Sequence, residues 1–229
     1  MPAPDLPRIF PLSESSLVVE FGSEISVELN ERAIALADQL DTNPFPGYIE
    51  SVPCYASTAV FYDLLTVKRE VPSGSTAFDA VQALIRSVLN SVRPKTDQER
   101  RQIEIPVSFA EPNALDLPFI AESAGLSPSE VIDIFTSTIY RVYMLGFLPG
   151  FTYMGEIDKR IAVPRKQAPR LKVPPGSVGI AGRQTGIYPF ESPGGWQIIG
   201  RTNEEMFSLD REPNSLLQPG DEVRFVPMP

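Results

Sequence analysis

Hydrophobic residues in the first hundred positions alternate between the spacing of strands and the spacing of helices. Short apolar runs predict strands at 16–21, 48–55, 58–65 and 102–109. Between them, hydrophobic residues at every third or fourth position predict helices over 27–40 and 78–92. The resulting order β-α-β-β-α-β is typical of a ferredoxin-like sandwich, with the segment 102–109 as its last strand.

The second half of the chain has a different pattern. Two short helices are predicted first, one over 115–123 and one that begins with the capping-box sequence Ser127-Pro128-Ser129-Glu130. From Arg141 onward the chain holds 11 of its 15 glycines and 11 of its 24 prolines, and turns separate short apolar segments. This pattern indicates a compact β-barrel with a final edge strand at 222–226. We therefore expect an α+β protein with a ferredoxin-like domain at 1–95 and a β-barrel domain at 96–229.

Composition excludes several kinds of chemistry. The 229 residues include no histidine, which removes the usual Ser-His-Asp and Cys-His nucleophiles and nearly all zinc sites. Cys54 is the only cysteine, so neither an intrachain disulfide nor a cysteine metal cluster is expected. The carboxylates are scattered, and we predict no metal site.

Charge is distributed unevenly along the chain. The net charge is −9, yet residues 141–201 hold nine basic and three acidic side chains, a local balance of +6. A basic region in an acidic chain suits a small anion better than a long polyanion, so we expect no nucleic-acid partner. The amino terminus lacks a signal-peptide pattern and no apolar stretch is long enough to span a bilayer. We therefore expect a cytoplasmic protein with no membrane partner.

Three neighbouring segments of this basic region hold the candidate chemistry. Residues 140–153 place Phe147 and Phe151 among glycines, either as a pocket wall or as filling of the barrel. Residues 163–174 hold Arg165 and Arg170 between prolines, either as a rigid anion clamp or as a solvated basic loop.

The third segment, 176–196, is rich in glycine and ends at the only tryptophan, Trp196. Backbone N–H groups beside these glycines are able to hold an anion, but glycine content alone is weak evidence for a phosphate site, and the chain contains no Walker A or dinucleotide-binding motif. A single tryptophan more often packs in the core with its N–H satisfied than it lines a binding site. Across the three segments we predict one substrate-binding pocket, which contains Arg165, Arg170, Gln184, Tyr188, Phe147, Phe151 and Trp196.

The most specific motifs of the chain lie in these same segments. VYMLGFLPGFTYMG, AVPRKQAPRLKVPPGSVGIAG and QTGIYPFESPGGWQIIGRT resemble the allophanate hydrolase subunit 1 family, and fainter similarity extends over nearly the whole chain. That family includes the 5-oxoprolinase subunit PxpB and the sporulation-kinase inhibitor KipI. The resemblance implies a ferredoxin-like domain followed by a cyclophilin-like β-barrel.

The resemblance also implies a function in a complex. It indicates a non-autonomous, PxpB-like component of an ATP-dependent 5-oxoprolinase, which opens 5-oxoproline to glutamate together with a larger PxpC-like subunit 2 and a PxpA-like protein. The substrate is then a small anionic amide; the complex uses ATP, and this chain alone binds no cofactor. A KipI-like inhibitor of a sensor histidine kinase and a subunit related to allophanate hydrolase or urea carboxylase are the alternatives. A prolyl isomerase is not favoured, because a fold does not determine a function.

Two positions differ from the family pattern. Related sequences have a histidine where this chain has Phe135, and a glycine-rich tetrapeptide where it has Ser108-Phe109-Ala110-Glu111. Both differences remove groups that could line a site.

Overall fold

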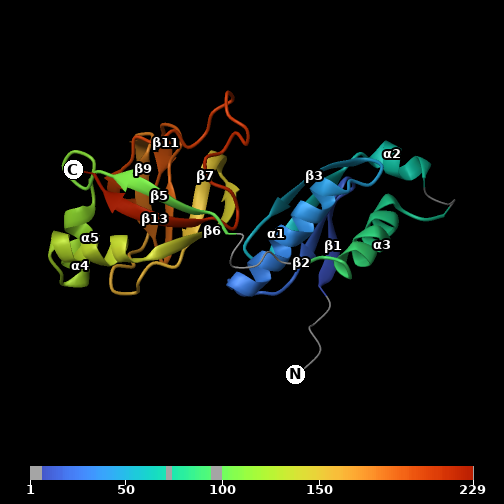
Figure 1. Cartoon of the computed structure of the whole chain (residues 1–229), viewed down its shortest axis with the longest axis horizontal. Helices are drawn as coiled ribbons and strands as arrows, with labels where there is room; N and C mark the ends of the chain where they lie inside the picture. Colours follow the sequence, from blue (N-terminus) through green and yellow to red (C-terminus); the bar gives the residue numbers. More distant parts are fainter. Residues whose placement is uncertain (1–6, 71–73, 94–99, 229) are drawn as a thin grey trace, which may run out of the picture. The chain divides into compact units, whose positions relative to one another are not determined.

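The computed structural model describes residues 7–70, 74–93 and 100–228. The chain forms two compact units, Met1–Glu99 and Arg100–Pro229 (Figure 1). The first unit has one four-stranded antiparallel sheet in the order β1-β2-β4-β3. Its strands are β1 (Arg8–Ser13), β2 (Ser16–Glu20), β3 (Tyr48–Pro53) and β4 (Ser57–Tyr62).

Helices α1 (Val27–Thr42), α2 (Leu64–Arg69) and α3 (Ala77–Leu89) complete the first unit. The helix α1 begins where the Ser26 hydroxyl accepts a hydrogen bond from Leu29 N, and α3 begins at a capping box formed by Thr76 and Asp79. Alternate residues of β2 and β4 are buried against α1 and α3, so the core lies between the sheet and these helices. The two long helices agree with the predicted hydrophobic spacing.

The strand predicted at 102–109 does not belong to the ferredoxin-like sheet. Strand β5 (Gln102–Val107) pairs in parallel with β13 (Glu222–Pro227) in the second unit, where Ile105 lies opposite Phe225. In the first unit the corresponding edge position is taken by β1, which forms a hairpin with β2. The hydrophobic pattern did not reveal β1 because Pro11 interrupts it, and an edge strand tolerates proline.

The second unit is built on a seven-stranded sheet with the order β12-β9-β10-β7-β6-β13-β5. Its outer strands meet at a bridge in which Ser108 and Arg201 exchange backbone hydrogen bonds of 2.8 and 3.0 Å, so the sheet is a nearly closed barrel. Strand β13, expected at an edge, lies between β6 and β5. The strands not yet located are β6 (Ile139–Gly146), β7 (Leu148–Gly155), β9 (Ser177–Ala181), β10 (Gln184–Ile187) and β12 (Gln197–Arg201).

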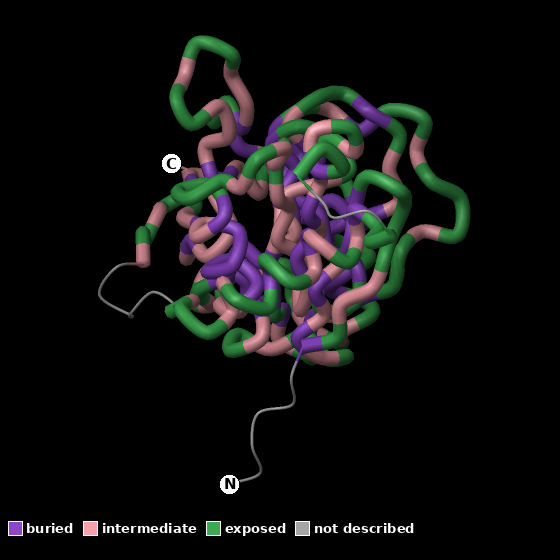
Figure 2. Tube along the Cα trace, turned by 90° about the vertical axis from the view of Figure 1, so that its right-hand side faces the viewer, coloured by how far each residue is buried: buried purple, intermediate pink, exposed green. Residues whose placement is uncertain are grey.

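Two helices and a short ribbon complete this unit. Helices α4 (Leu117–Ala124) and α5 (Pro128–Ser137) lie side by side at one end of the barrel (Figure 1). The α5 residue Phe135 stacks on Phe225 with ring centroids 4.9 Å apart, which closes the barrel core. Strands β8 (Arg170–Val173) and β11 (Ser192–Gly194) form a separate two-stranded ribbon. Long exposed loops lie outside the buried segments (Figure 2).

The barrel unit has two distinct hydrophobic clusters. Neighbouring residues alternate between them: Ile180 and Ile199 fill the barrel, whereas Ala181 and Ile198 belong to a second cluster on the other side of the sheet. The second cluster also includes Phe151, Tyr188 and Trp196. Among the residues that the structure describes, no helix has the length and apolar content needed to cross a bilayer.

Candidate functional site

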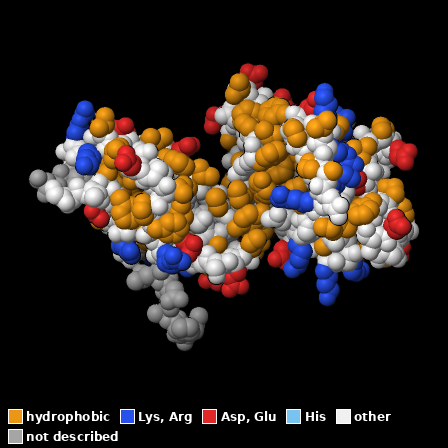
Figure 3. Space-filling view, turned by 180° about the vertical axis from the view of Figure 1, so that it is seen from behind, with side chains coloured by type: hydrophobic (Ala, Val, Ile, Leu, Met, Phe, Trp, Pro, Cys, Tyr) orange, Lys and Arg blue, Asp and Glu red, His pale blue; other side chains and the backbone are white. Residues whose placement is uncertain are grey.

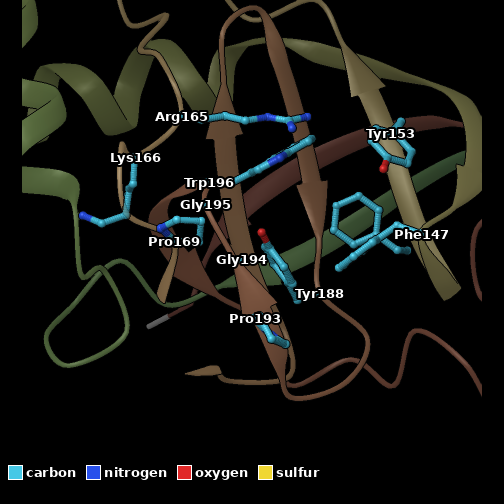
Figure 4. Close-up of a pocket in the computed structure, with 11 residues that line it drawn as sticks. Phe147, Tyr153, Arg165, Lys166, Pro169, Tyr188, Pro193, Gly194, Gly195 and Trp196 are labelled. Atoms are coloured by element: carbon cyan, nitrogen blue, oxygen red, sulfur yellow. The ribbon is translucent and has the colours of Figure 1, made fainter. Parts of the chain in front are cut away.

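A cavity of about 330 Å³ lies beside the second hydrophobic cluster, on the outer side of the barrel sheet. Strand β7, the turn before it, the loop after β10 and the segment that leads into β12 supply most of its walls (Figure 4). The remaining wall is residues 163–170, which we call the basic arm. The lining residues are Phe147, Phe151, Tyr153, Arg165, Lys166, Pro169, Tyr188, Pro193, Gly194, Gly195 and Trp196.

Buried aromatic rings form the inner wall of the cavity. The ring of Phe151 makes edge-to-face contacts with Tyr188 and Trp196, with centroids 5.2 and 5.5 Å apart. All three side chains are at most 5% exposed. The rings therefore pack against one another and also present their remaining surface to the cavity.

Phe147 lies at the rim of the cavity, in the turn between β6 and β7. It is 60% exposed, and its ring contacts Phe151 edge to face at 5.4 Å. Its φ is +70°, the only positive value found outside glycine among the described residues. A left-handed conformation is unfavourable for a bulky residue, and such strain is concentrated at functional sites.

The basic arm brings one cation to the aromatic wall. The Arg165 guanidinium lies 5.7 Å from the centroid of the Trp196 ring, and in Figure 4 its side chain extends across the cavity. The Lys166 side chain points away from Trp196 in the same view, while its backbone N–H donates to the Gly195 carbonyl at 2.7 Å. On the face drawn in Figure 3, basic side chains of this unit lie beside exposed hydrophobic ones.

Two of the seven predicted pocket residues lie outside the cavity lining. Arg170 donates two hydrogen bonds to the Asp116 carboxylate at 2.7 and 2.8 Å, so its planar donor group is already occupied within the protein. Gln184 lies in β10 opposite Ala181 and Gly155. The structure brings together the other five: Arg165, Tyr188, Phe147, Phe151 and Trp196.

Asp116 was not recognised from the sequence. It precedes the Leu117-Pro118 start of α4, where an aspartate is usually a helix cap. Burial raises the pKa of Asp116, but hydrogen bonds from Arg170 and Ile198 N–H and the positive charges of Arg170 and Lys166 outweigh it and lower the pKa below its ordinary value. The carboxylate is therefore ionised at neutral pH.

Tyr188 supplies a neutral hydroxyl at the cavity. Burial raises its pKa above the ordinary value, although a hydrogen bond from the Trp196 backbone and the charge of Arg165 oppose this shift. The cavity thus offers one guanidinium, two phenols (those of Tyr188 and Tyr153) and several aromatic faces. This combination suits a small, flat molecule with a negative charge at one end.

The residue at the position of the family histidine is not part of this cavity. Phe135 is fully buried in α5 and packs against Tyr140 and Phe225 in the barrel core. Phe135 therefore belongs to the core packing of the barrel and not to the cavity wall.

A ferredoxin-like sheet followed by a nearly closed barrel, with an aromatic and basic cavity on the barrel, defines the class of this protein. Residues 7–217 match the family described as "Carboxyltransferase domain, subdomain C and D", and the chain belongs to that family. The 5-oxoprolinase B-subunit of Bacillus subtilis is 44% identical over 96% of this chain and 92% of its own length. The Escherichia coli O157:H7 protein of the same name is 38% identical over 96% of this chain and 95% of its own length.

A similar fold is known from a longer protein. The crystal structure of TTHA0988 superposes with a TM-score of 0.80 and is 37% identical over 93% of this chain. This chain spans only 40% of that longer one. The resemblance inferred from the three motif segments is confirmed at the level of the family.

Proposed function

We propose that this chain is the non-autonomous, PxpB-like component of an ATP-dependent 5-oxoprolinase, which opens 5-oxoproline to glutamate. The observation that carries this proposal is the similarity to proteins named as the B-subunit of 5-oxoprolinase, because it extends over 96% of the chain and nearly all of each relative. The partners we propose are a larger PxpC-like protein and a PxpA-like protein, with ATP used by the complex in the cytoplasm.

The chemistry of the cavity supports this proposal. 5-Oxoproline is a five-membered lactam with one carboxylate, and a cavity of about 330 Å³ is large enough for it. We assign the carboxylate to Arg165, the ring to the faces of Phe151 and Trp196, and the lactam oxygen to the Tyr188 hydroxyl. A fixed donor at that oxygen stabilises the negative charge that develops there when the amide bond is attacked.

The test of this proposal is reconstitution. The purified chain alone is expected to show no 5-oxoproline-dependent ATP hydrolysis, because it contains no nucleotide-binding motif. Adding the PxpC-like and PxpA-like proteins should give a stable complex that forms glutamate. The control is the same mixture without this chain. Turnover by the isolated chain, or full turnover by the mixture that lacks it, would contradict the proposal.

A second prediction concerns the strained rim residue. Replacing Phe147 by Asn, which tolerates the left-handed conformation, is expected to leave the melting temperature unchanged within about 3 °C, because relief of strain offsets the lost ring contact. The affinity for 5-oxoproline should fall about fivefold, since one wall of the cavity is removed. Thermal denaturation and a titration followed by Trp196 fluorescence measure the two effects. A large loss of stability with unchanged affinity would instead make Phe147 a packing residue.

A further inference from the structure

We propose that Asp116 is a positioning residue for the cavity: its carboxylate fixes the basic arm against β12 and thereby places Arg165 over Trp196. The consequence for 5-oxoproline binding rests on the proposed function, whereas the consequence for the geometry of the arm does not. Asp116 itself does not line the cavity and acts through its neighbours.

The Asp116 carboxylate connects three segments that are distant in the sequence. Its two oxygens accept the two hydrogen bonds from Arg170 and a third from Lys166 Nζ at 3.3 Å. A fourth hydrogen bond comes from the backbone N–H of Ile198 in β12 at 2.6 Å. The side chain is only 6% exposed, so these contacts are shielded from water and from salt.

The position of Asp116 in its helix shows that these contacts replace a more usual one. Asp116 is the N-cap residue of α4, yet its side chain makes no capping hydrogen bond. An N-cap aspartate ordinarily accepts from a backbone N–H of the first helical turn. Here the backbone N–H of Asp116 donates to the Ile198 carbonyl at 2.8 Å, so that Asp116 and Ile198 are joined by two hydrogen bonds. The carboxylate is thus held on the strand and directed at the arm.

The contacts of Asp116 hold the arm at two points next to the residues that line the cavity. Lys166 and Arg170 stand on either side of Pro169, and Lys166 follows Arg165 directly. Arg165 and Pro169 both line the cavity. Among the described residues Arg165 has no carboxylate partner, so its guanidinium is held near Trp196 by the arm rather than by an ion pair of its own.

Removing the Asp116 charge is therefore expected to leave two cations unpaired and to displace the basic arm from the cavity. Without it, Arg170 and Lys166 are left half-buried without a counter-ion, beside a third cation at Arg165. The three like charges are expected to separate by moving the arm away from β12. Trp196 would then be more exposed to solvent. The Arg165 guanidinium would no longer be in position to bind a ligand carboxylate.

Asp221 provides a matched control in the same unit. Its side chain is also 6% exposed and accepts two hydrogen bonds from one arginine, Arg101, at 2.6 and 2.9 Å. It likewise accepts a backbone N–H, that of Gln218, at 2.6 Å. None of these three residues lines the cavity. Arg101 is more exposed than Arg170, at 50% against 22%, so the two sites match in the carboxylate and not in the burial of the arginine. The effect of neutralising a buried, hydrogen-bonded carboxylate appears in both variants, whereas an effect on the cavity is expected only from the Asp116 variant.

The experiment compares Asp116→Asn with Asp221→Asn in the full chain and in the reconstituted complex. Both variants should melt at a lower temperature than the unchanged chain, Asp116→Asn by roughly 10 °C and Asp221→Asn by less, because Arg101 is half exposed to water. Only Asp116→Asn should shift the emission of Trp196, the single tryptophan, and raise its quenching by acrylamide about twofold through local opening of the arm. In the complex, only Asp116→Asn should raise KM for 5-oxoproline about tenfold with kcat nearly unchanged.

Arg170→Lys is the second variant and keeps the test decisive if Asp116→Asn does not fold. This variant preserves the charge but loses the bidentate hydrogen bond of the guanidinium. It should change Trp196 quenching and KM in the same direction as Asp116→Asn, by a smaller factor. Equal Trp196 quenching in the Asp116, Asp221 and Arg170 variants would overturn the proposal. If the unchanged complex does not turn over 5-oxoproline, the proposed function fails, and the quenching comparison still decides the role of Asp116.

Discussion

Replacing Gly176 by Ala is expected to lower the melting temperature of the barrel unit by roughly 10 °C or more. Gly176 has a φ of +79°, and a Cβ built there would lie 2.1 Å from the carbonyl oxygen of Thr202. The left-handed conformation alone costs about 1–2 kcal/mol in an alanine, and the clash with backbone adds to it, for a total on the order of 4 kcal/mol. A loss of that size corresponds to a shift of roughly 10 °C in a unit of this size.

The backbone of Gly176 has little room to shift, because hydrogen bonds hold it on both sides. Its N–H donates to the Tyr188 carbonyl at 2.7 Å, and its carbonyl accepts from Thr202 N at 2.9 Å. The control is Gly182→Ala, since Gly182 has a φ of +60° but no atom within 4 Å of the added Cβ. That variant bears only the conformational cost, so its melting temperature should fall by about 3–5 °C. An equal fall in melting temperature in the two variants would show that the Thr202 backbone moves readily to make room for the added Cβ.

Replacing Arg165 by Glu is expected to raise KM for 5-oxoproline roughly 100-fold in the reconstituted complex. The exchange removes the attraction between the guanidinium and the ligand carboxylate and adds a repulsion between two carboxylates. A loss of about 2.7 kcal/mol in binding free energy corresponds to a 100-fold change. Arg165→Lys should cost only a few-fold, because the charge stays while the planar donor and its contact with Trp196 are lost. Initial rates at varied 5-oxoproline and saturating ATP measure both variants.

A charge reversal elsewhere on the barrel unit controls for long-range electrostatics. Arg160 is 61% exposed, pairs with Asp158 at 2.7 Å and does not line the cavity. Arg160→Glu should therefore change KM less than about twofold, since exposed charges are screened over a Debye length of about 10 Å. If Arg160→Glu and Arg165→Glu have the same effect, net charge rather than a carboxylate contact governs binding.

Local structure and family membership follow from sequence patterns alone. Hydrophobic spacing and capping residues located α1, α3 and α5 because helix formation depends on neighbours within one or two turns. Glycine and proline content located the barrel unit, since these residues mark turns regardless of which strands the turns connect. The three motif segments likewise indicated the stretch that forms the cavity, because most of its wall comes from residues 147–196.

Tertiary structure alone decided which segments meet. The pattern of β5 shows that it is a strand, but period-two alternation does not specify the neighbour, and β5 pairs with β13 about 120 residues away along the chain. The same reason applies to Arg170. The sequence predicted that it binds a ligand, whereas in the folded chain it forms an ion pair with Asp116, 54 residues earlier. Whether a basic side chain is available for a substrate depends on the carboxylates that folding brings beside it, and only the folded chain places them.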